Sequence, residues 1–145
     1  MQLAAIETPT LAIGCELSGP EDGHPVILLH GWPDDVRTWD RVLPAFHGAR
    51  FKTVVPYLRG FGKTRFRSPK TARSGQLSAL GQDLLDLVDV LELEHFSVVG
   101  HDWGARAAYI ASCMEGPPRY WLNEKLTRGL LPFGWRLKSR YAGEV

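Results

Sequence analysis

The segment VVGHDWGARAAY, from Val98 to Tyr109, constrains the fold of this chain more strongly than any other stretch. Apolar β-branched residues lead into the pentapeptide GHDWG, and a run typical of a helix follows it. Asp102 stands between the two glycines, where a buried strand is expected to turn into a helix. An ionised carboxylate is poorly suited to the end of a buried strand unless exposure of its side chain serves the function of the protein. The pattern glycine–any–nucleophile–any–glycine is typical of a sharp turn that lifts a nucleophile above a sheet.

The sequence up to residue 112 alternates between strand-like and helix-like patterns. Short apolar runs predict strands, and apolar residues that recur every three to four positions predict helices. In chain order we expect a strand at 11–17, a strand at 26–29, a helix at 36–46, a strand at 51–55, a helix at 77–91, a strand at 96–100 and a helix at 105–112. This alternation predicts an α/β fold with a mostly parallel sheet and flanking helices.

Composition narrows the classes of function. The chain has 145 residues, which fits one domain of ordinary size. Its 17 Lys+Arg and 16 Asp+Glu nearly cancel, which argues against a nucleic-acid or membrane partner. The two cysteines show no metal-ligand spacing, and the N-terminus lacks the basic and apolar segments of a signal peptide. We therefore expect a cytoplasmic protein with no metal and no cofactor.

Two further motifs accompany the pentapeptide. HGWPDD occupies His30–Asp35 directly after the second predicted strand, and YLRGFGKTRF occupies Tyr57–Phe66 after the third. With GHDWG, these motifs occur in an order that resembles the α/β-hydrolases, and within them the epoxide hydrolase and haloalkane dehalogenase branch. That branch carries aspartate at the turn where esterases and lipases carry serine. The resemblance covers roughly residues 9–112.

The resemblance implies a catalytic site. Asp102 would be the nucleophile, whose carboxylate attacks an electrophilic carbon to form an alkyl-enzyme ester. The backbone N–H groups of Trp32 and Trp103 would form the oxyanion hole. Five motif residues would shape the two turns: His30, Gly31, Pro33, Gly100 and Gly104. The implied substrate is a small molecule, an epoxide or a halogenated compound, and the tryptophan of HGWP favours the epoxide hydrolases over the haloalkane dehalogenases.

Each of these residues also has a purely structural interpretation. Asp102 alone suits a helix N-cap. His30 is expected to be a structural hydrogen-bonding residue in its loop, and His101 a packing residue whose ring faces the interior. Trp32 and Trp103 suit either the core or the lining of a pocket. A metal site has no supporting ligand spacing, although four candidate ligands lie in these motifs: His30, Asp34, His101 and Asp102.

The charged residues of the loop after the third predicted strand and of the helix that follows it are expected to face solvent. The basic residues between Arg59 and Arg73 lie in a predicted loop. Acidic residues occupy much of the side opposite the leucines of the 77–91 helix and the position directly after it: Asp83, Asp86, Asp89 and Glu92. A solvated loop face and an outer helix face are the ordinary places for such residues.

The sequence after GHDWG departs from the family pattern. All five histidines precede Asp102, whereas the family places an acid and a histidine downstream. We expect residues 1–112 to be the N-terminal part of an α/β-hydrolase domain without the cap and the C-terminal strands, and 113–145 to be a divergent tail of a truncated or frame-shifted product. The alternatives are a genuinely short variant whose tail folds as one helix, and a non-catalytic remnant or partner-binding scaffold. The strand at 96–100 would then form an exposed sheet edge, so self-association is expected.

Overall fold

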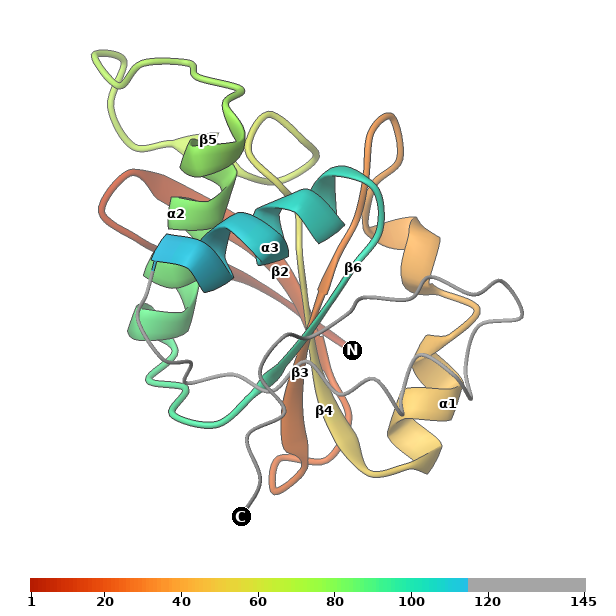
Figure 1. The fold of residues 1–145 in the computed structure, drawn as a ribbon. Helices are drawn as coiled ribbons and strands as arrows, with labels where there is room; N and C mark the ends of the chain where they lie inside the picture. The colour runs from red at the N-terminus through yellow and green to blue at the C-terminus, as the bar shows by residue number, and fades with distance from the viewer. Residues whose placement is uncertain (115–145) are drawn as a thin grey trace.

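The computed structural model describes residues 1–114, which form a six-stranded sheet with helices on both faces (Figure 1). The strands are β1 (Gln2–Glu7), β2 (Leu11–Ser18), β3 (His24–Leu29), β4 (Phe51–Pro56), β5 (Arg65–Phe66) and β6 (Ser97–Gly100). The helices are the 3-10 helix η1 (Val36–Trp39), α1 (Leu43–Gly48), α2 (Leu77–Val90) and α3 (Trp103–Met114). The predicted strands are present in the predicted order. The expected divergent tail, 113–145, lies outside the described residues apart from Cys113 and Met114.

The sheet is mixed, with a parallel half around β3 and an antiparallel half around β2. In the order β1-β2-β4-β3-β6, β3 pairs in parallel with β4 and β6. β2 instead pairs antiparallel with β1, β4 and β5. The sequence pattern missed β1 because this edge strand is largely exposed and its residues, QLAAIE, include a single β-branched side chain. The sequence pattern also missed β5, because a strand of two residues inside a predicted loop is too short to show any periodicity.

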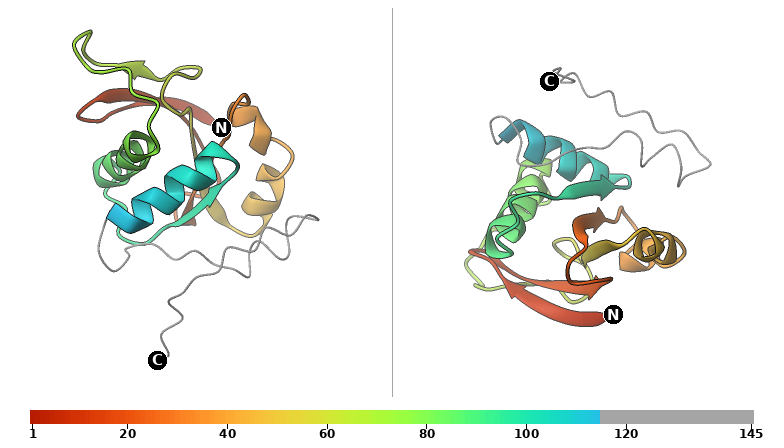
Figure 2. Two further views of the ribbon diagram at one scale, coloured as in Figure 1. Left: turned by 45° about the horizontal axis from the view of Figure 1, so that its top comes forward. Right: turned by 90° about the horizontal axis from the view of Figure 1, so that it is seen from below.

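β3 lies in the middle of the parallel half and is buried on both faces. Val26 and Leu28 pack with residues of η1 and α1, whereas Ile27 and Leu29 pack with residues of α2 and α3. Figure 2 shows the same layers, with α2 and α3 on one side of the sheet and α1 on the other. Burial on both faces explains why the sequence of this strand is a continuous apolar run rather than an alternating one.

The predicted helix at 36–46 is wrong in its continuity, because two short helices, η1 and α1, replace it. Pro44 has no N–H to donate to the carbonyl four residues back, and its ring would clash with that carbonyl, so it cannot stand inside one long helix. Pro44 lies instead in the first turn of α1, where it is tolerated. The predicted apolar stripe itself is confirmed, because four of its members are buried in one cluster: Val36, Trp39, Leu43 and Phe46.

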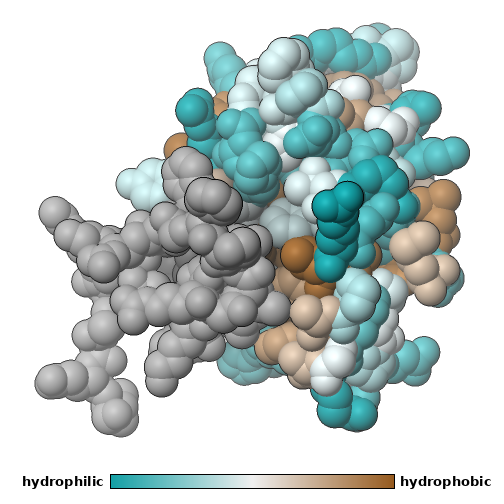
Figure 3. Space-filling model, turned by 90° about the vertical axis from the view of Figure 1, so that its right-hand side faces the viewer, coloured by the Kyte–Doolittle hydropathy of each residue, from teal (hydrophilic) through white to brown (hydrophobic). Residues whose placement is uncertain are grey.

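The face of the molecule that carries η1 and α1 is covered mainly by hydrophilic side chains, with apolar ones in small areas between them (Figure 3). A few large hydrophobic side chains of the described residues are exposed, among them Leu3, Trp32 and Tyr109. None of the helices within residues 1–114 is long and apolar enough to cross a membrane.

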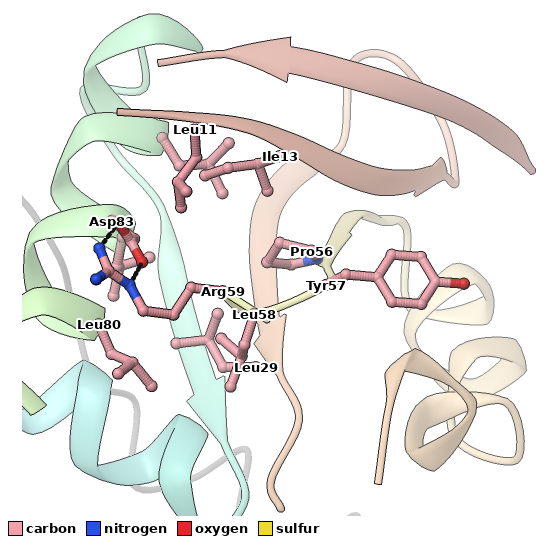
Figure 4. Close-up of a pocket in the computed structure, with 11 residues that line it drawn as sticks. Leu11, Ile13, Leu29, Pro56, Tyr57, Leu58, Arg59, Leu80 and Asp83 are labelled. Atoms are coloured by element: carbon pink, nitrogen blue, oxygen red, sulfur yellow. Dashed lines mark hydrogen bonds and ion pairs between the residues drawn. The ribbon is translucent and has the colours of Figure 1, made fainter. Parts of the chain in front are cut away.

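Arg59 and Asp83 overturn the expectation that both face solvent. Nε and Nη2 of Arg59 each donate to an Asp83 carboxylate oxygen at 2.6 Å, and both side chains are only 10% exposed (Figure 4). Nη1 of Arg59 donates to the carbonyl of Ser74 at 2.9 Å. Burial raises the pKa of Asp83, and the guanidinium of Arg59 opposes that rise. The pair fastens the loop that follows β4 to α2.

Removing one member of this ion pair is expected to destabilise the fold more than removing both. Asp83→Asn leaves the Arg59 guanidinium buried without a countercharge, which lowers the free energy of unfolding by about 3–5 kcal/mol. The double variant Asp83→Leu/Arg59→Met replaces the pair with apolar side chains and is expected to recover most of that loss. Urea denaturation followed by circular dichroism measures both. Equal destabilisation by the single and double variants would show that an uncompensated charge is not the cause.

The expectation of self-association concerns strand β6, which within residues 1–114 pairs on one side only, with β3. An unpaired strand edge presents free N–H and C=O groups to other chains. We therefore expect the protein to associate at micromolar concentration, and Val99→Lys, which adds a charge to this half-buried strand position, to reduce association. Light scattering during size-exclusion chromatography tests this. A wild-type monomer that unfolds cooperatively at all concentrations would contradict it.

Candidate active site

The segment GHDWG forms a tight turn between the end of β6 and the start of α3. Asp102 has a φ of 49°, in the left-handed region that costs a non-glycine residue about 1–2 kcal/mol. The His101 N–H donates to the Leu29 carbonyl at 3.0 Å, and the Gly104 N–H donates to the His101 carbonyl at 2.9 Å. The Arg106 N–H donates to the Asp102 carbonyl at 3.2 Å. These bonds hold the turn, so that the Asp102 side chain is exposed.

The two glycines of the turn are required by close packing. A Cβ atom at Gly104 would lie 2.6 Å from the carbonyl oxygen of His30, and closer still to that of Leu29. A Cβ atom at Gly100 would lie 2.5 Å from the carbonyl oxygen of Gly104. Real side chains do not tolerate such separations, so α3 approaches the ends of β3 and β6 this closely only because both residues lack a Cβ.

The loop after β3 brings a second backbone segment to Asp102. Gly31 lies directly against it, since a Cβ atom at residue 31 would be 2.6 Å from the Cβ of Asp102. The next backbone N–H, that of Trp32, donates to Oδ2 of Asp102 at 3.1 Å. Pro33 follows with a cis peptide bond to Trp32, whose side chain is 63% exposed. Trp32 therefore meets Asp102 through its backbone, and its indole is not part of the core.

Backbone N–H groups favour the ionised form of Asp102. The N–H of Trp32 is the main influence that lowers the pKa of this carboxyl, and the N–H of Trp103 is the second. The charges of Arg106 and His101 lower the pKa further, whereas burial opposes them. The structure therefore brings together three residues singled out in the sequence, Asp102, Trp32 and Trp103, and makes the carboxylate an anion at neutral pH.

His30 is fully buried beneath this loop, and both of its ring nitrogens have partners. Nδ1 lies 2.9 Å from the carbonyl oxygen of Gly31, and the N–H of Leu58 donates to Nε2 at 3.1 Å. A carbonyl only accepts and an amide N–H only donates, so the ring is neutral and carries its proton on Nδ1. Burial also lowers the pKa of His30, in agreement with a neutral ring. This is the structural hydrogen-bonding role that the sequence suggested.

The expectation for His101 needs correction. His101 is exposed and is not an inward packing residue, because the turn that lifts Asp102 lifts its neighbour as well. Trp103 is half-buried against the core formed with α2 and α3, which agrees with the core alternative for this residue. In the N-cap alternative for Asp102, the carboxylate accepts from the second or third N–H of the helix; the second, that of Gly104, donates instead to the His101 carbonyl. Sequence reasoning missed Arg106, whose position four residues after Asp102 places it one helical turn along α3.

The pocket in Figure 4 lies between β2, β3 and α2 and is not lined by Asp102. Its cavity volume of about 20 Å³ holds about one water molecule, so it is a packing defect beside the Arg59–Asp83 pair rather than a substrate site. Among the described residues, no group of three His, Cys, Asp or Glu side chains is arranged to hold a metal ion. The chemistry that these residues offer at Asp102 is that of an exposed, ionised carboxylate bordered by backbone donors.

Comparison with known proteins bears on the fold of this chain. A family model described as alpha/beta hydrolase fold matches residues 24–119. The epoxide hydrolase of Caballeronia sordidicola is 35% identical over 98 residues, which are 68% of this chain and 29% of that protein. The soluble epoxide hydrolase of Corynebacterium sp. strain C12 is 36% identical over 87 residues, or 60% of this chain and 29% of that protein. A crystal structure of a candidate epoxide hydrolase from Klebsiella pneumoniae has a TM-score of 0.71 and 46% identity, and covers 74% of this chain and 35% of that one. The chain thus spans 29% to 35% of the length of these relatives.

The close approach at Gly104 has a measurable effect on stability. Gly104→Ala is expected to lower the free energy of unfolding by about 1–3 kcal/mol, because the methyl group must displace α3 or the end of β3. Gly48→Ala in α1 is the matched control, since a Cβ atom there meets nothing within 4 Å. Because Gly48 has no positive φ, this substitution is expected to stabilise by about 0.4–1 kcal/mol, chiefly by reducing the entropy of the unfolded chain. Chemical denaturation of both variants tests the argument, which fails if their unfolding free energies change alike.

Proposed function

This chain belongs to the alpha/beta hydrolase fold family, and we propose that it provides the nucleophile of an epoxide hydrolase, Asp102. One observation carries the proposal: the backbone N–H groups of Trp32 and Trp103 converge on the carboxylate of a residue held in the left-handed conformation. The relatives named as epoxide hydrolases support the substrate class. Residues 1–112 are accordingly the N-terminal part of an α/β-hydrolase domain.

In the proposed reaction, the Asp102 carboxylate attacks a carbon of the epoxide. A bond forms between a carboxylate oxygen and that carbon, the epoxide C–O bond breaks, and its electron pair passes to the epoxide oxygen, which takes a proton from an acid or from water. Oδ2 is held by the N–H of Trp32, so Oδ1 is the attacking oxygen. The product is an alkyl ester of Asp102.

The two backbone donors serve both steps of this chemistry. Before attack they favour the anionic carboxylate, which is the nucleophilic form. When water later adds to the carbonyl carbon of the ester, negative charge develops on the oxygen beside the same donors. Trp32 and Trp103 are therefore the oxyanion hole of the proposed mechanism, and they act through the backbone alone.

Hydrolysis of the ester needs a base that activates water. The five histidines of the printed sequence all precede Asp102. His30 is buried and bonded to two backbone groups, which leaves it no lone pair for a water molecule. We propose that residues 1–145 by themselves carry out the first step only, so that the ester forms and persists.

Alkylation of Asp102 tests the proposal directly. Incubation of the protein with styrene oxide is expected to raise its intact mass by that of one epoxide, and peptide mapping is expected to place the adduct on Asp102. Asp102→Asn should abolish the adduct, because the neutral amide is not a nucleophile. Asp22→Asn should retain it, since Asp22 is another exposed carboxylate, with 75% of its side chain accessible, outside the site.

The other outcomes discriminate between functions. A folded wild type that gives no adduct would reject Asp102 as a nucleophile and favour a non-catalytic scaffold. An adduct formed with an alkyl bromide but not with the epoxide would favour a dehalogenase-like activity. Release of the diol by the wild type would show that the printed chain contains its own base.

A further inference from the structure

We infer that His30 is a positioning residue: it sets the orientation of the peptide group between Gly31 and Trp32, and through that group the hydrogen bond to Asp102. The inference rests on the function proposed for Asp102 and adds a buried residue that touches neither the nucleophile nor a substrate. It assigns a role to the histidine of HGWP and to the loop after β4, which contains Leu58.

A single peptide group connects His30 to Asp102. Its carbonyl oxygen, that of Gly31, accepts from Nδ1 of His30 at 2.9 Å. Its N–H, that of Trp32, donates to Oδ2 of Asp102 at 3.1 Å. In a trans peptide the C=O and N–H bonds lie in one plane and point in opposite directions. The hydrogen bond from His30 therefore aims the N–H at the carboxylate.

This peptide group needs such an external hold. Residue 31 must be glycine, because a Cβ atom there would lie 2.6 Å from the Cβ of Asp102. A glycine has few steric limits on its backbone dihedral angles, so the peptide group that follows it turns more easily than one that follows any other residue. The close contact with Asp102 thus requires a glycine at residue 31, and glycine restrains the orientation of the Trp32 N–H only weakly. The hydrogen bond from His30 supplies the missing restraint.

His30 is itself held in the state that this task requires. The N–H of Leu58 donates to Nε2 at 3.1 Å, which leaves Nδ1 as the protonated nitrogen that can donate to Gly31. The ring packs edge-on against Phe61 at 4.9 Å between centroids. Leu58 precedes Arg59, whose guanidinium is bonded to Asp83 and to the carbonyl of Ser74. The ion pair on α2 therefore anchors the loop that fixes the tautomer of His30.

Two amide substitutions separate this role from simple space-filling. In His30→Asn the amide nitrogen takes the place of Nδ1 and can still donate to Gly31, while the bond from Leu58 is lost. In His30→Gln the amide oxygen takes the place of Nε2 and can still accept from Leu58, while the donor to Gly31 is lost. Both variants remove an aromatic ring from the core, so a purely structural role predicts the same consequences for both.

The measurement is the pKa of Asp102 in the full 145-residue protein, followed by carbon NMR of the carboxyl group and assigned with Asp102→Asn. We expect His30→Gln to raise the pKa of Asp102 toward that of an ordinary aspartate, and His30→Asn to raise it less. His47→Gln is the matched control, because it replaces the ring of another part-buried histidine, one that is hydrogen-bonded to Ser18 and Thr53, and it should leave the pKa of Asp102 unchanged.

The unmodified protein provides an independent test. Nitrogen chemical shifts of the His30 ring should show a neutral ring with the proton on Nδ1; a proton on Nε2, or a charged ring at neutral pH, would overturn the inference even if neither variant folds. Equal pKa values of Asp102 in wild type and His30→Gln would also overturn it. Because the tautomer and this pKa are read without any reaction, a failure of alkylation alone would count against the proposed function and not against the role of His30.

Discussion

The close approach of α3 to the carboxyl end of β3, permitted by glycine at residue 104, is the contact on which the rest of the site depends. It leaves room for only a short connection from β6, which forces the backbone of Asp102 into the left-handed region and turns its carboxylate away from the core. The loop that continues β3 is brought beside that carboxylate by the same contact. A strained residue persists in such a place because the packing of the two elements around it determines its conformation.

Much of the fold was predictable because it depends on patterns within single elements. The apolar run of β3 and the leucine periodicity of α2 each reflect burial that the neighbouring residues share, so a short window of sequence contains the signal. Pro44 shows where such a window is misleading. The apolar stripe across 36–46 marks a buried face correctly, but a single missing N–H divides the segment into two helices. The edge strand β1 was missed because an exposed strand has no burial pattern to read.

The site was predictable in its positions but not in its contacts. The family resemblance of the three motifs singled out Asp102, Trp32 and Trp103, which the structure brings together, whereas Asp83 was misplaced because its partner lies 24 residues away in the sequence. A buried charge is acceptable only where a distant residue compensates it, and no local pattern reveals that residue. The partner of His30 is harder still to foresee, since it is a backbone N–H 28 residues away that any amino acid except proline would supply.

The exposed indole of Trp32 separates two properties that active-site residues usually combine. Its peptide N–H meets the carboxylate, while 63% of the side chain lies in solvent. In the proposed function, the donor at residue 32 is a backbone N–H, so its position depends on the conformation of the backbone and not on the identity of the amino acid. A scan that replaces side chains would therefore pass over this donor. The side chain at residue 32 can therefore change, and with it the choice of substrate, while the backbone N–H that contacts Asp102 stays in place.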